Sequence, residues 1–135
     1  MRGLGMLRRE ARRYYAELHP QFAKLLRARS GALPIHHRRQ LEHAHLFPDE
    51  DMNAGENLAM VQNHVHTKIN VLWGRFREAR PNPTADEVRR AAEIIDGHFE
   101  PWYHRATDPP GLTRTAEEAR EAALRELRSQ FPGLE

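Results

Sequence analysis

Six of the chain's nine histidines fall within residues 35–70, which make up about a quarter of its length. They are His36, His37, His43, His45, His64 and His66. A histidine side chain changes its charge near neutral pH, and its neutral ring is a common metal ligand. Such crowding therefore indicates proton transfer, metal binding or both. Because the chain has no cysteine, a metal site here would have to use histidine, carboxylate, amide and water.

The charge of the chain is divided unevenly. Residues 1–45 hold ten lysines and arginines against three acids, whereas the whole chain has a formal net charge of only +2. A basic segment beside a histidine cluster is typical of a phosphate-binding surface. A solvated helix face in an arginine-rich protein would have the same composition, so charge alone leaves both interpretations open.

Helices are predicted on both sides of the histidine-rich stretch. Apolar residues recur at helical spacing over residues 4–29, and Pro20 divides them into two helices, of which Gly31 stops the second. Two further helices are predicted over residues 84–98 and 115–131. Each begins with a capping box, in which a threonine precedes a glutamate by three residues. A chain of 135 residues is then one domain, residues 1–135.

The histidine-rich stretch itself has a different pattern. Two short apolar runs, "LPIHH" and "NLAMV", are predicted as a strand pair joined by a long polar loop. From Gln62 the apolar period changes to that of an amphipathic helix, on which His66 and Asn70 lie four residues apart and so project from the same side. The predicted fold class is therefore mainly α with a small strand–loop–strand–helix unit at about residues 33–76.

The order and spacing of the polar residues in this unit resemble the HNH family of nucleases. A histidine pair stands on the first strand, an asparagine follows in the connection, and His66 and Asn70 lie on the helix. The resemblance implies a ββα-metal core. The phrases "LEHAHLFPDEDMN" and "NLAMVQNHVHTKINVLW" are also similar to toxin nuclease modules at the C-terminal ends of large secreted bacterial proteins.

The resemblance implies a role for each of these residues. His37 would be the general base, and His36 and His66 would bind one divalent metal ion, which could be Mg, Mn, Zn or Ni. Asn70 stands where many relatives have a further histidine and is the predicted third ligand. His64 is the alternative, although its place two residues before His66 turns it to another side of the helix. Asn57 would tie the loop and hold His37 in orientation through hydrogen bonds.

The activity that the resemblance implies is hydrolysis of nucleic-acid phosphodiesters. Arg38 and Arg39 are predicted to grip phosphate, because the guanidinium group binds it in a bidentate manner. Nothing in the sequence indicates a base-reading helix, so we expect a largely sequence-nonspecific endonuclease acting on DNA, with RNA left open. A toxin module would act in the cytoplasm of a target bacterial cell, as part of a larger secreted protein, and a cognate immunity protein would mask it.

No stretch of the sequence reaches the roughly 20 apolar residues of a membrane span, and the first residues lack the apolar core of a signal peptide. We therefore expect no membrane partner and no signal peptide of the chain's own. Two other classes of protein stay open. One is a non-catalytic histidine–zinc module, which would need four closed ligands. The other is a helical DNA-binding or partner-binding module without metal. The sequence offers few good metal ligands beyond two and leaves His37 to act as a base, which favours the enzyme.

Overall fold

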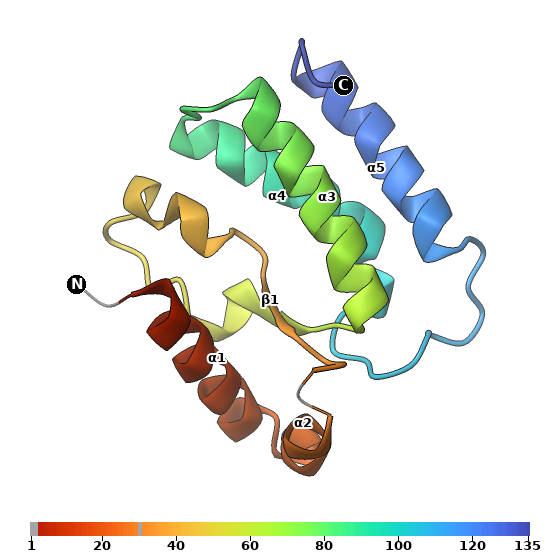
Figure 1. Cartoon of the computed structure of the whole chain (residues 1–135). Coiled ribbons are helices and arrows are strands. Elements are labelled where there is room, and N and C mark those ends of the chain that lie inside the picture. The colour runs from red at the N-terminus through yellow and green to blue at the C-terminus, as the bar shows by residue number, and fades with distance from the viewer. Residues whose placement is uncertain (1–2, 30) are drawn as a thin grey trace.

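The computed structural model describes residues 3–29 and 31–135, and this part of the chain is mainly helical with one two-stranded antiparallel sheet (Figure 1). This confirms the predicted class, mainly α with a small β component. The helices are α1 (Leu4–Leu18), α2 (Ala23–Ala28), α3 (Asn63–Ala79), α4 (Ala85–Phe99) and α5 (Ala116–Gln130). The strands are β1 (Ile35–His37) and β2 (Leu58–Met60), and the short 3-10 helices are η1 (Pro20–Phe22), η2 (Leu41–Leu46), η3 (Gly55–Asn57) and η4 (Glu100–Trp102).

The predicted helix signals are found in the structure, with one shift. Both capping boxes form: the hydroxyl of Thr84 accepts from the backbone N–H of Glu87, and Thr115 does the same for Glu118. The proline at position 20 opens η1, so the first helix ends as predicted. The second helix was predicted to reach residue 29, just before Gly31, and it ends one residue earlier at Ala28, because the backbone leaves the helical region at Arg29, with φ −128° and ψ 44°.

The sheet lies between two groups of helices. Its register places Ile35 opposite Met60, His36 opposite Ala59 and His37 opposite Leu58. Since successive strand residues point to opposite faces, Leu58 and Met60 pack among residues of α1 and α2, whereas Ala59 packs into the larger core of α3, α4 and α5. Figure 1 shows β1 running between the N-terminal pair and the other helices. The sheet therefore links two apolar clusters.

The long connection between the strands is tied down by a buried asparagine. The side chain of Asn57 accepts from the backbone N–H of Arg39 at 2.8 Å and donates to the carbonyls of Arg39 at 3.2 Å and Met52 at 2.8 Å. Its own carbonyl accepts from the backbone N–H of Arg38 at 2.8 Å. These bonds continue the pairing of the two strands by two residues. They confirm the predicted loop-tying role of Asn57.

Trp102 and Tyr103, which follow α4, are buried in the larger core. His43 and His45 lie on η2. Within residues 3–29 and 31–135, no helix combines the length and the apolar character that crossing a bilayer requires.

The burial of His43 predicts a stability that depends on pH. Its ring lies 5.4 Å from that of Trp73 and 6.0 Å from that of Phe76, and burial, reinforced by the charge of Arg77, lowers the pKa of His43 to about 4. The unfolded chain binds this proton near pH 6.5. Below that pH the ring of His43 is protonated in the unfolded state but stays neutral in the folded state. The free energy of unfolding should therefore fall by about 2 kcal/mol from pH 7 to pH 5 through this residue alone.

His43→Phe should remove this part of the pH dependence, and urea unfolding at the two pH values would measure it. The control is His45→Gln, on the same short helix but exposed, which should leave the dependence as in the wild type. An unchanged dependence in His43→Phe would show that folding does not lower the pKa of His43.

Candidate functional site

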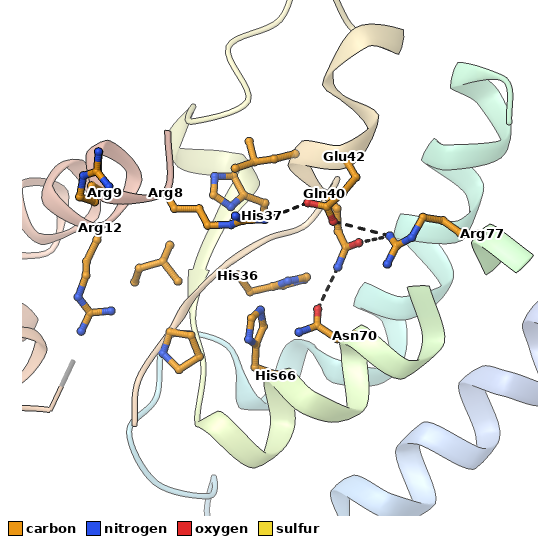
Figure 2. Close-up of a pocket in the computed structure, with 13 residues that line it drawn as sticks. Arg8, Arg9, Arg12, His36, His37, Gln40, Glu42, His66, Asn70 and Arg77 are labelled. Carbon is orange, nitrogen blue, oxygen red and sulfur yellow. Dashed lines mark hydrogen bonds and ion pairs between the residues drawn. The ribbon is translucent and has the colours of Figure 1, made fainter. Parts of the chain in front are cut away.

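A cavity of about 620 Å³ opens beside the sheet, between α1, β1, η2 and α3 (Figure 2). Four of the predicted site residues line it: His36 and His37 from the strand, and His66 and Asn70 from α3. The fold therefore brings together the base and the three metal ligands that the resemblance implies. The cavity also carries a strong positive charge from Arg8, Arg9, Arg12 and Arg77.

His36 is the most unusual residue of the site. Its side chain is buried, and neither ring nitrogen has a hydrogen-bond partner among the residues that the structure describes. Its ring lies 5.8 Å from that of His66 and 5.7 Å from that of Tyr103. Burial, reinforced by the neighbouring charge of His66, holds the pKa of His36 well below its usual range, so the ring is neutral.

A buried polar atom without a partner costs about 1–3 kcal/mol, and nearly all such atoms in proteins are satisfied. A neutral imidazole whose nitrogens lack protein partners has a lone pair to give to a metal ion. The environment of His36 therefore fits a metal ligand.

Two residues of α3 complete the candidate ligand set. His66 is half-buried, and burial lowers its pKa, so it too is neutral at pH 7. Asn70 lies one turn further along, and its side-chain oxygen accepts from the amide of Gln40 at 3.0 Å. His64 is exposed on another side of the helix, where it contacts Gln62 at 3.2 Å.

Among the described residues, no three histidine, aspartate or glutamate side chains are close enough to hold one ion. His36, His66 and Asn70 all line the cavity and stay the predicted ligands, whereas the neighbouring His37 and Glu42 are bonded to Asn53 and Arg8. The remaining positions around an ion would belong to water and substrate.

His37 differs from His36 in having a firm partner. Its Nε2 lies 2.8 Å from the side-chain oxygen of Asn53, whose amide group donates to the carbonyl of Leu7 at 3.1 Å. Because that second bond fixes which end of the amide is oxygen, Nε2 of His37 must carry the proton. Nδ1 is then the atom that can accept one. Burial lowers the pKa of His37, although the bond to Asn53 opposes this, so the ring is neutral at pH 7.

The orienting hydrogen bond corrects one prediction. Asn57 was expected to hold His37 in place, but its side chain bonds to the backbone of Arg39 and Met52, and Asn53 holds the ring instead. No sequence signal singled out Asn53 within the polar loop, because its role depends on α1 approaching that loop.

Arg38 and Arg39 do not line the cavity. The Arg38 guanidinium lies 4.8 Å from the ring centre of Tyr103 and 3.7 Å from the carboxylates of Asp96 and Glu100. Arg39 pairs with Glu50 at 3.4 Å. The chain turns these side chains toward α4 and the loop, so their phosphate role stays a prediction that the geometry does not favour.

The arginines that do face the histidines come mainly from α1, where the sequence showed its basic excess. Arg12 is committed to structure, because it donates to the carbonyls of Leu33 and Leu26, both at 2.7 Å. Arg8 and Arg9 are exposed at the rim, and Arg77 reaches in from α3. The positive charge beside the site is therefore supplied by two helices that flank the strand.

Comparison of the chain with protein-family models, with curated proteins and with solved structures finds no match. The site has to be interpreted from its own residues. His36 is a buried imidazole without hydrogen-bond partners, and His66 lies beside it. His37 is held by the amide of Asn53, and arginines surround the three rings. Together they define a cavity suited to binding a metal ion and an anionic substrate.

Proposed function

We propose that the chain is a metal-dependent endonuclease of the HNH type, which hydrolyses phosphodiester bonds in nucleic acid. In this proposal β1, β2 and α3 form its ββα-metal core. One observation carries it above the others: His36 is buried with both ring nitrogens unpartnered beside His66. The next residue of the strand, His37, borders the same cavity with one nitrogen bonded and the other available.

His37 acts as the general base in this proposal. Nδ1 takes a proton from the water that attacks phosphorus, while the bond from Nε2 to Asn53 keeps the ring in the required tautomer and orientation. The lowered pKa of His37 keeps Nδ1 free of protons at neutral pH and into the mildly acidic range. Asn53 is thus a positioning residue, which touches the base and not the substrate.

His36, His66 and Asn70 would hold the divalent ion, be it Mg, Mn, Zn or Ni. When bound, such an ion supplies Lewis acidity that neutralises the charge developing on the leaving oxygen. The burial of His36 closes one side of the site to water. The other side opens into the arginine-lined cavity, where an anionic backbone can enter.

The substrate class follows from the charge of the cavity. Contacts between arginine and phosphate carry no sequence information, so the enzyme would cut nucleic acid, with DNA as the proposed substrate, with little sequence preference. The similarity to toxin modules extends the proposal: the chain acts in the cytoplasm of a target bacterial cell as part of a larger secreted protein, and a cognate immunity protein protects the producer.

Plasmid degradation tests the proposal. Purified protein, stripped of metal and then supplied with Mg²⁺ or Mn²⁺, should nick and linearise a supercoiled plasmid, and EDTA should stop the reaction because the ion is essential. A labelled single-stranded RNA assayed in parallel would show whether the enzyme distinguishes the two nucleic acids.

The same assay separates the alternatives. A non-catalytic histidine–zinc module would lose stability when its metal is removed, and no metal would support cleavage of the plasmid. A metal-free DNA-binding module would shift the plasmid in a gel whether or not EDTA is present, again without cleavage. Either result would overturn the nuclease proposal.

A further inference from the structure

A carboxylate stands between two of the cavity arginines. One oxygen of Glu42 accepts from Arg8 of α1 at 3.1 Å, and its other oxygen lies 3.8 Å from Arg77 of α3. Glu42 itself lies on η2. Figure 2 shows Glu42 between Arg8 and Arg77, with a dashed line to each. Two guanidinium groups from separate helices thus converge on a single anionic group.

This anion site is next to the histidines. Arg8 is close enough to lower the pKa of both His37 and His66, and Glu42 is close enough to raise that of His37. All of these side chains line one cavity. An anion held by the two arginines would therefore lie beside the base.

We propose that Arg8 and Arg77 form a two-arginine grip for a phosphate of the nucleic acid, and that Glu42 occupies this grip until substrate displaces it. The inference rests on the proposed function, since it names how the nuclease holds its substrate. It also replaces Arg38 and Arg39 as the phosphate-binding arginines.

The exposure of the three side chains makes displacement easy. Arg8, Glu42 and Arg77 are 57%, 37% and 36% exposed, and ion pairs this open to water are weak. A phosphodiester offers two anionic oxygens in place of the two of the carboxylate, and further phosphates along the strand add to the attraction. The substrate therefore competes well against a single glutamate.

Arg77 keeps a second partner when Glu42 leaves. Arg77 also donates to the side-chain oxygen of Gln40, whose amide donates in turn to Asn70 at 3.0 Å. Gln40 is buried, so this chain of hydrogen bonds holds Arg77 from the interior of the protein. It also joins the phosphate site directly to a candidate metal ligand.

Binding can be measured apart from cleavage. The protein would be the whole chain of residues 1–135 with His37→Ala, kept in EDTA. Its binding to a fluorescent DNA duplex of about 15 base pairs would be followed by anisotropy over a series of KCl concentrations. Adding Glu42→Gln should tighten binding by roughly three- to tenfold, because no ion pair has to be broken and no carboxylate repels the phosphate. Arg8→Ala or Arg77→Ala should weaken it about tenfold and reduce the slope of log affinity against log salt by about one.

The matched control is Glu50→Gln. Glu50 pairs with Arg39 at 3.4 Å and is 40% exposed, so the substitution removes the same charge from a similar ion pair outside the cavity. It should change affinity by less than about twofold. In the Arg8→Ala background, Glu42→Gln should lose most of its effect.

Equal tightening by Glu42→Gln and Glu50→Gln would overturn the grip, even if the wild type cleaves plasmid, because the effect would then be one of overall charge or of Arg39. Absence of binding in every variant would overturn it as well. If instead binding depends on Glu42, Arg8 and Arg77 as described but no metal supports cleavage by the wild type, the grip stands and the nuclease proposal fails.

Discussion

Replacing His37 with alanine should lower the rate of plasmid cleavage by about 10²- to 10⁴-fold, the range expected for loss of a general base. The residue is proposed to move a proton and not to bind the ion, so metal affinity should stay close to that of the wild type. The fold should also persist, because the ring makes one hydrogen bond, to Asn53, at the edge of the cavity. Initial rates on supercoiled plasmid and isothermal titration with Zn²⁺ would measure the two properties separately.

Asn53→Ala is the matched variant. It leaves the imidazole in place but removes the acceptor that fixes its tautomer, so we expect an intermediate loss of roughly ten- to a hundredfold. The acidic limb of its pH–rate profile should also move to lower pH than in the wild type. The hydrogen bond to Asn53 raises the pKa of His37 and so opposes the effect of burial, and the variant lacks this bond. Loss of zinc binding in His37→Ala would mean that His36 and His37 have exchanged roles.

Replacing His66 with alanine should abolish both metal-dependent stabilisation and cleavage. For the wild type, zinc at about 100 times its dissociation constant should raise the free energy of unfolding by about 2.7 kcal/mol, which corresponds to an increase in Tm of roughly 10 °C for a chain of this size. His66 is one of the two imidazoles proposed as ligands, so its loss leaves the ion with His36 and the amide of Asn70. Thermal unfolding of metal-stripped protein, with and without Zn²⁺, would measure the shift.

His64→Ala is the control for this experiment, because His64 is exposed on the same helix two residues earlier and outside the cavity. It should keep the full zinc-dependent increase in Tm. Asn70→His should enlarge that increase by adding a third nitrogen donor. If His66→Ala keeps the full zinc-dependent increase in Tm, His66 is not a ligand and the HNH interpretation is wrong. If Asn70→His shows the same increase as the wild type, only Asn70 is excluded as a ligand.

Much of the framework could be predicted because its signals are local. The capping boxes at Thr84 and Thr115 and the apolar spacing of α3 each lie within a few residues of the structure they specify. The short apolar run before α3 likewise predicts β2. The resemblance carried by the order of His36, His37, His66 and Asn70 implies that they lie in one place. The cavity that these four line agrees with that expectation.

The partners of these residues were decided by the tertiary structure alone. Asn53 orients His37 because it bonds to Leu7, which is 46 residues away in sequence. Arg38 and Arg39 turn from the cavity because the acids of α4 and of the loop lie on their side of the chain. Glu42 meets Arg8 and Arg77 only because α1 and α3 flank the same strand. Hydrogen bonds and ion pairs of this kind join groups distant in sequence, so their choice depends on how the helices pack and not on any pattern that a short stretch of residues can carry.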